Sequence, residues 1–192
     1  HLALTGRSCS SRNGNAESFI FKNLFQHTTR SPREGEVNGV NYHFISRDEF
    51  EQRVSDGGFL EYAEYCGNLY GTPMKEVNEM LEKGMNVILE IEVQGAIKVM
   101  NKRPDALSIF IAPPSIAELR RRLHKRGTET EDVIEQRIAQ ASNEVALAAK
   151  YDYIIVNDAL EDAVDDFFHV VRAEQLRSDK RPEIIAVIIK NS

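Results

Sequence analysis

Two arginines three residues apart, Arg30 and Arg33, stand in a polar stretch that runs from residue 28 to residue 36. Arginine presents a planar fork of N–H donors that matches the oxygens of a phosphate, so both side chains could converge on one phosphate group. The phenol of Tyr42 would add a further donor. A solvated charged turn would use the same residue types, and their spacing alone leaves both interpretations open.

Glu61 precedes the tripeptide Tyr70-Gly71-Thr72 in a segment rich in aromatic residues. Guanine offers N1–H and N2–H₂ as adjacent donors, which a single carboxylate can accept together. Adenine lacks this pair of donors. A carboxylate at Glu61 could accept such a pair of donors, and the alternative is a carboxylate on the wet face of a strand.

Two further carboxylates, Glu90 and Glu92, close an apolar run that predicts a buried strand over residues 87–91. Side chains two apart on a strand share a face, so both are expected to project together. They would stand at the carboxyl end of the strand, where open α/β sheets bind their ligands. Acidic groups inside such a strand need partners, because burying an unpaired charge is costly.

Basic residues gather between Arg120 and Arg126, and Arg137 follows downstream. Arg122 and Arg126 are four apart and share a helix face. A solvated basic helix end, which also suits the helix dipole, is the alternative to a phosphate site. The histidines show no spacing typical of metal ligands.

Apolar strands alternate with amphipathic helices along the chain, which predicts an α/β fold with a parallel sheet. Ser115 and Gly127 fit an N-cap and a C-terminal stop. Residues 37–70 predict a small, partly antiparallel insertion, and the apolar tail at 184–189 could be a docking strand or carry no meaning. The expected strands cover residues 2–4, 87–91, 107–112 and 153–156, and the expected helices cover residues 73–83, 93–102, 115–126, 131–149 and 160–176.

The chain has 192 residues, which suits one compact domain. Its formal net charge of −6 argues against a nucleic-acid partner, because an anion would then have to be bound by a local arginine cluster. Two distant cysteines, Cys9 and Cys66, favour a reducing cytoplasm over a disulfide framework. No apolar run approaches the roughly 18 residues of a membrane span. The oligomeric state stays open.

The pattern Thr-Thr-Arg-x-Pro-Arg-x-Gly-Glu, followed by Gly-x-x-Tyr-x-Phe, resembles the GMP-binding signature of guanylate kinases, and every fixed position is present. The resemblance continues over residues 28–174. It implies a parallel-sheet P-loop nucleoside-monophosphate kinase core with a small mixed α/β GMP-binding insertion and a lid. The core would comprise residues 1–27, 71–122 and 150–192, the insertion residues 28–70, and the lid about residues 123–149.

The implied reaction is transfer of the γ-phosphate of ATP to GMP, with Mg²⁺ accompanying ATP. Arg126, Arg137 and Arg30 would be catalytic, and Arg126 and Arg137 would also contact ATP together with Asn157. Glu92 would face the metal through water, at a position where the family commonly has aspartate. The implied GMP site comprises Arg30, Arg33, Glu36, Tyr42, Glu61, Tyr70, Gly71, Thr72 and Glu90.

The N-terminal segment departs from the family's phosphate loop, whose backbone N–H groups cradle phosphate. Gly6 and Ser8 align, and Arg12 stands where a lysine is usual, so these three are the candidate phosphate-loop residues. Gln26 also replaces a serine that usually contacts GMP. Three accounts stay open: a degenerate loop, an erroneous stretch of sequence between about Gly6 and Phe25, or an unusual loop that uses Arg12.

Two other functions compete with an active guanylate kinase. A catalytically impaired module that binds GMP or a protein would explain the altered loop, but it would have no need of Arg126 and Arg137 together. A kinase for another monophosphate would lack a reason for Glu61 with Thr72.

Overall fold

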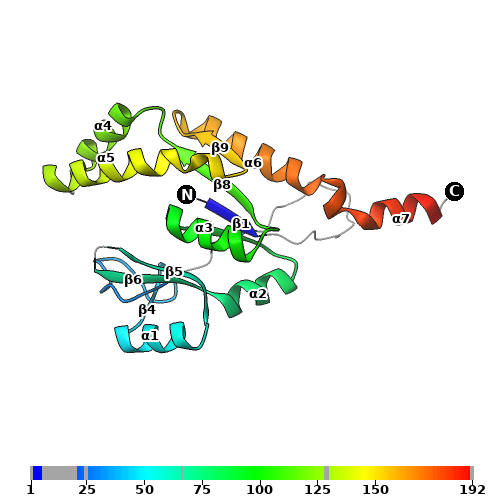
Figure 1. The fold of residues 1–192 in the computed structure, drawn as a ribbon, viewed down its shortest axis with the longest axis horizontal. Coiled ribbons are helices and arrows are strands. Elements are labelled where there is room, and N and C mark those ends of the chain that lie inside the picture. Colours follow the sequence, from blue (N-terminus) through cyan, green and yellow to red (C-terminus); the bar gives the residue numbers. More distant parts are fainter. Residues whose placement is uncertain (1, 6–20, 24–25, 66, 128–129, 191–192) are drawn as a thin grey trace. The chain divides into compact units, whose positions relative to one another are not determined.

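The computed structural model describes residues 2–5, 21–23, 26–65, 67–127 and 130–190 (Figure 1). The chain forms two compact units, His1–Leu107 and Ser108–Ser192. The predicted α/β class is confirmed, while the predicted division into a core, an insertion and a lid stays a prediction. None of the helices in these ranges combines the length and the apolar composition that crossing a bilayer requires.

In one sheet of the first unit, β7 (Asn86–Glu90) lies between two other strands, β1 (Leu2–Thr5) and β2 (Phe21–Asn23). β2 runs parallel to β7, whereas β1 runs antiparallel, with Leu2 opposite Glu90 and Thr5 opposite Val87. The expectation of a uniformly parallel sheet is therefore wrong for β1. An apolar run predicts that a strand exists, but its direction depends on the connection that follows, which the local pattern does not encode.

The same unit carries a second sheet of four strands in the order β4-β3-β6-β5. β6 (Asn68–Pro73) pairs antiparallel with both β3 (His27–Thr28) and β5 (Phe59–Tyr65), while β4 (His43–Phe44) is parallel to β3. The predicted small, partly antiparallel sheet is confirmed. Its register places Glu61 opposite Thr72 and Ala63 opposite Tyr70, so these four side chains share one face.

Helix α1 (Arg47–Ser55) was not predicted. Only Phe50 of this helix is buried, so it has no repeating apolar stripe that would have indicated a helix. Its signal is at the N-terminus, where the Ser46 hydroxyl accepts a bond from the Glu49 N–H at 3.1 Å. The sequence Ser-x-x-Glu is a capping box that could have revealed the helix.

The four-stranded sheet packs on α1 through a small aromatic core (Figure 1). Phe50 is fully buried and stacks on Phe59 with ring centroids 4.5 Å apart, and Leu69 completes the cluster. Gly71 of β6 lies directly beneath these rings, and a Cβ there would approach both within 2.9 Å. Glycine at this position therefore lets the two rings close over the strand.

Two more helices of the first unit, α2 (Met74–Glu82) and α3 (Val93–Lys102), lie close to the predicted bounds. α3 begins directly after β7 and packs against β5 and β1. Val93, Ala96 and Val99 form its buried stripe at helical spacing. This helix therefore supports both sheets of the unit.

In the second unit, β8 (Leu107–Ala112) and β9 (Tyr153–Val156) pair in parallel, as predicted. The Asp152 carboxylate ties the two segments together, because it accepts bonds from both the N–H and the hydroxyl of Ser108. The helices are α4 (Ile116–Arg126), α5 (Glu131–Ala146), α6 (Leu160–Gln175) and α7 (Pro182–Lys190), with short 3-10 turns at Ala148–Lys150 and Ser178–Lys180.

The ends of α4 confirm the predicted signals. The Ser115 hydroxyl accepts a bond from the Glu118 N–H at 3.0 Å, and Gly127 ends the helix with a φ of 65°. Leu123 packs with Ile134 and Ile138 of α5. The apolar tail, for which a docking strand was one expectation, instead forms α7, with Pro182 at its first position, where a missing N–H costs nothing.

We expect Phe50→Ala to lower the free energy of unfolding by about 3–5 kcal/mol, since it removes a fully buried ring from the α1 core. Equilibrium urea denaturation measures the change. The matched control is Phe168→Ala, which truncates a ring that is 42% exposed and should cost less. Equal losses in both variants would show that the Phe50 cluster is not a core.

Candidate active site

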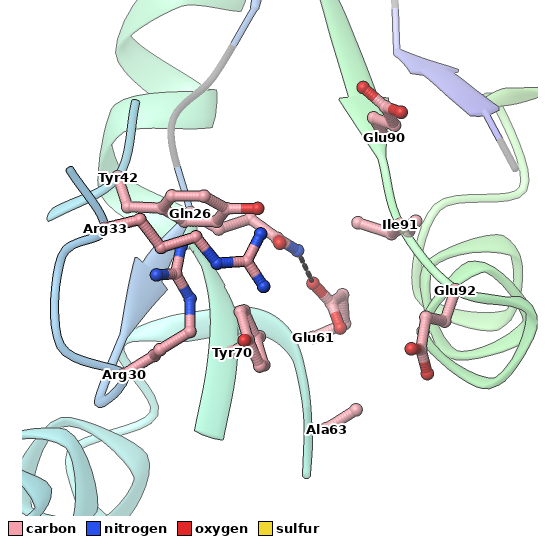
Figure 2. A pocket seen from close by; sticks show the side chains of 11 residues that line it. Gln26, Arg30, Arg33, Tyr42, Glu61, Ala63, Tyr70, Glu90, Ile91 and Glu92 are labelled. Carbon is pink, nitrogen blue, oxygen red and sulfur yellow. Dashed lines mark hydrogen bonds between the residues drawn. The ribbon is translucent and has the colours of Figure 1, made fainter. Parts of the chain in front are cut away.

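The first unit holds a cavity of about 350 Å³ on the face of the four-stranded sheet that carries Glu61 and Tyr70 (Figure 2). This volume is in the range of pockets that hold small organic ligands. Its walls come from the start of β3, the loop before β4, strands β5 and β6, and the junction between β7 and α3. The lining residues are Gln26, Arg30, Arg33, Tyr42, Glu61, Ala63, Tyr70, Glu90, Ile91, Glu92 and Gly95.

Arg30 and Arg33 occupy one end of the cavity. Arg30 donates to the Glu36 carboxylate at 2.9 Å, and the other oxygen of Glu36 accepts the Arg33 backbone N–H at 2.7 Å. Figure 2 shows the two guanidinium groups close together beside Tyr42. Glu36 therefore folds the loop into a tight turn that presents both cations to the same space.

Aromatic rings pack around the Arg30 guanidinium. Its carbon lies 5.4 Å from the centroid of Tyr42 and 5.7 Å from that of Phe44, which are cation–π distances. The hydrogen bond to Glu36 raises the pKa of Arg30 above its ordinary value, so the guanidinium stays charged. Burial, followed by the neighbouring Tyr70, raises the pKa of Tyr42, so this phenol stays a hydrogen-bond donor at neutral pH.

The other functional end of the cavity is built on the buried carboxylate of Glu61, which is only 3% exposed. The Thr72 hydroxyl donates to its Oε1 at 2.6 Å, and the Gln26 amide donates to the same oxygen at 3.2 Å. Gln26 also reaches the Thr72 hydroxyl oxygen at 3.4 Å. The direct cross-strand pairing of residues 61 and 72 brings the first two groups together.

Burial raises the pKa of Glu61 above its ordinary value of 4.5. The hydrogen bonds from Thr72 and Gln26 and the charge of Lys98 oppose this rise, because they favour the ionised form. The site therefore holds a desolvated carboxylate with fixed orientation. Such a group binds adjacent N–H donors strongly, since water competes little for it.

Glu90 and Glu92 both line the cavity, but the expectation that they project together from a strand is wrong. β7 ends at Glu90, whose side chain is exposed, and Glu92 is the N-cap residue of α3. Figure 2 shows the two carboxylates pointing apart on either side of Ile91. The strand ends at Glu90, before Ile91 and Glu92, so the period-two rule does not extend to Glu92.

Several cavity residues were outside the predicted site set: Gln26, Ala63, Ile91 and Gly95. Gln26 could have been included, because the sequence already marked it as a replacement at a GMP-contacting position. Ala63 could have been found from its period-two relation to Glu61 on β5. Gly71, by contrast, lies toward Phe50 and Phe59 and does not line the cavity.

The second unit holds three more of the predicted residues, Arg126, Arg137 and Asn157. Asn157 follows β9, and its backbone oxygen accepts a bond from Arg122 at 2.8 Å, while Glu118 accepts from the Nε of Arg122. Hydrogen bonds from Arg121 and Arg122 lower the pKa of Glu118 to about 2. Arg126 is the exposed last residue of α4, and Arg137 is half-buried on α5, with its Nε inaccessible to solvent.

The three candidate phosphate-loop residues, Gly6, Ser8 and Arg12, lie outside the described residues, as does most of the stretch for which three accounts stay open. Among the residues that the structure describes, no three His, Cys, Asp or Glu side chains gather closely enough to hold a metal ion. Protein carboxylates therefore do not form a metal cage in that part of the chain.

One cavity on an α/β scaffold therefore combines a cationic, phenol-bearing end with a buried carboxylate end. The family model for guanylate kinase matches residues 15–174. The chain therefore belongs to the guanylate kinase family.

Individual relatives agree with this assignment. A guanylate kinase of Bacillus subtilis (strain 168) is 52% identical over 153 residues, which cover 80% of this chain and 75% of the relative. One from Neisseria gonorrhoeae is 47% identical over 166 residues, covering 86% of this chain and 81% of the relative. The crystal structure of guanylate kinase from Anaplasma phagocytophilum superposes with a TM-score of 0.71 at 38% identity, covering 82% of this chain and 78% of that one.

We expect the stability of the native chain relative to Glu61→Gln to fall as the pH rises from 4.5, the ordinary pKa of a glutamate, through the higher pKa of the folded state. The folded state binds the Glu61 proton more tightly than the unfolded state, where the carboxyl titrates near 4.5. Raising the pH through this window therefore costs the native chain stability that the glutamine variant keeps. Urea denaturation of both proteins at a series of pH values tests this. A difference that does not change with pH would contradict a raised pKa.

Proposed function

We propose that the cavity of the first unit is the GMP site of an enzyme that transfers the γ-phosphate of ATP to GMP. The observation that carries this is the presence, within one cavity, of two arginines at one end and a buried, oriented carboxylate at the other. A nucleoside monophosphate has the matching polarity, with a dianionic phosphate at one end and a base at the other.

The phosphate of GMP would lie against Arg30, Arg33, Tyr42 and Tyr70. Its oxygens would take over the bond that Arg30 now donates to Glu36. A phosphate carries more charge than a carboxylate and accepts two guanidinium forks at once, so the exchange is favourable. Glu36 would keep its bond to the Arg33 backbone and hold the loop in shape.

The guanine base would lie against Glu61, which would accept N1–H and N2–H₂. Thr72 and Gln26 keep this carboxylate in place from behind, since both donate to Oε1. Adenine would leave the buried carboxylate without a donor pair, and an unpaired buried charge is strongly unfavourable. Selection of guanine over adenine would follow from that penalty.

Arg126 and Arg137 would supply positive charge to the transferred phosphoryl group. Phosphoryl transfer requires alignment of donor and acceptor and charge around the equatorial oxygens, and little covalent chemistry from the protein. Both arginines lie on the α4–α5 hairpin, which its own Leu123 cluster holds together. The hairpin could therefore move as one body when it closes over the substrates.

Mg²⁺ would arrive with ATP. Phosphate oxygens and water usually supply most of its six ligands, which agrees with the absence of a metal cage in the described part of the chain. Glu92, at the rim of the cavity, would reach it through water. When bound, the ion would neutralise charge between the β- and γ-phosphates. We further propose a cytoplasmic location and no nucleic-acid partner.

A coupled assay of ADP formation with ATP, Mg²⁺ and GMP tests the function. We expect turnover of roughly 1–100 s⁻¹ with GMP and little with AMP. Glu61→Gln should weaken GMP binding, measured by calorimetry, by about ten- to hundredfold, because it removes the anionic acceptor. GMP binding without turnover would favour the impaired binding module, and an unchanged GMP affinity in Glu61→Gln would contradict the role of Glu61.

Arg137→Ala should lower kcat by about 10²- to 10³-fold while the dissociation constant for GMP changes little, since the charge acts mainly in the transition state. The matched control is Arg121→Ala, which removes a largely exposed arginine of α4 that bonds Glu118. Thermal unfolding of both variants separates a folding defect from a catalytic one. Equal losses in binding and turnover for Arg137→Ala would argue against a lid role.

A further inference from the structure

A glycine occupies the first turn of α3, although alanine forms helices better. Gly95 is buried and lines the cavity beside Glu61. Its backbone is ordinary helix, so no unusual dihedral angle requires glycine here. The reason for the residue must therefore be the space that a side chain would fill.

That space belongs to the Glu61 carboxylate. A Cβ on residue 95 would lie 2.7 Å from Oε2 of Glu61 and 3.2 Å from its Cδ. Contacts this short do not occur between a carbon and an oxygen that are not bonded. Even the smallest side chain at position 95 would therefore force the carboxylate to move.

The carboxylate has little freedom to move. Its other oxygen, Oε1, is held by the Thr72 hydroxyl at 2.6 Å and by the Gln26 amide at 3.2 Å. A rotation that carried Oε2 away from residue 95 would also turn Oε1 out of these bonds. Because Glu61 is buried, water could not replace them.

Strand β5 cannot retreat from α3 either. It is the outer strand of the four-stranded sheet within the described ranges, and α3 holds it by hydrogen bonds. Two lysines of α3 bind carbonyl oxygens on either side of Glu61: Lys98 reaches Tyr62 at 2.7 Å, and Lys102 reaches Leu60 at 2.6 Å. Residues 95, 98 and 102 share one helix face, so the contact with Glu61 and both lysine bonds act together.

We propose that Gly95 is a positioning residue that sets where the Glu61 carboxylate stands and thereby sets the preference for guanine. The proposal rests on the GMP site described above. Gly95 brings the α3 backbone against Oε2, while Thr72 and Gln26 fix Oε1. The carboxylate is thus confined between a helix and a strand in one orientation.

Calorimetry of GMP and AMP binding to the purified chain tests the proposal without relying on turnover. Gly95→Ala should weaken GMP binding at least tenfold and reduce the preference for GMP over AMP, while the affinity for ATP changes less than twofold. The matched control is Asn101→Ala, an exposed position on the same helix, which should leave all three affinities unchanged. An unchanged GMP affinity in Gly95→Ala would overturn the proposal.

Making Gly95→Ala in the Glu61→Asp variant as well distinguishes a clash with the Glu61 carboxylate from a general packing defect. Glu61→Asp withdraws the carboxylate by one methylene, so Gly95→Ala should then change GMP affinity less than threefold and leave the melting temperature unaltered. The same tenfold loss in both backgrounds would overturn the proposal. If Gly95→Ala alone does not fold, recovery of folded protein in the Glu61→Asp background supports it, and failure of both variants to fold overturns it.

The outcomes also separate this proposal from the proposed function. Weaker GMP binding in Glu61→Gln with no effect of Gly95→Ala overturns only the role of Gly95. If the native chain does not bind GMP, the proposed GMP site is wrong, and so is the proposed role of Gly95 in selecting guanine. In that case the steric contact between residues 95 and 61 is supported only if Gly95→Ala lowers the melting temperature of the native chain and leaves that of the Glu61→Asp variant unaltered.

Discussion

The burial of one carboxylate is the constraint on which the site depends. An ionised glutamate removed from water is tolerated only where donors and nearby charge offset its lost hydration. Around Glu61 these come from three separate segments: Gln26 before β3, Thr72 on β6 and Lys98 on α3. The four-stranded sheet and α3 must therefore hold their positions for the charge to persist.

The two ends of the cavity accommodate opposite charges. At the arginine end, like charges must be held close together before any ligand arrives, and Glu36 with the rings of Tyr42 and Phe44 offsets their repulsion. At the Glu61 end, a single negative charge must be kept from water. The arginine end lies on the loop between β3 and β4, and Glu61 lies on β5 of the same small sheet, so the backbone of one sheet anchors both ends.

The sequence predicts the structure correctly where a local pattern determines the bounds of a strand or helix. The bounds of β8, β9 and α3, the Ser115 cap and the Gly127 stop follow from apolar period and capping chemistry. It was insufficient where long-range contacts decide. The direction of β1 depends on a connection that no short window contains. The separation of Glu90 from Glu92 and the helix α7 have local signals, the start of α3 at Val93 and Pro182, which the strand predictions did not use. Gln26 and Gly95 joined the site only through contacts with residues far along the chain.

The Arg30–Glu36 pair has a consequence for the cell, where inorganic phosphate is abundant. In a GMP site, Glu36 acts as an internal competitor that any anion must displace from Arg30. Free phosphate would have to break this ion pair without gaining a contact to Glu61, which lies elsewhere in the cavity. A nucleotide offsets the same cost through its base. If the cavity binds GMP as proposed, this ion pair would favour the nucleotide over simpler anions.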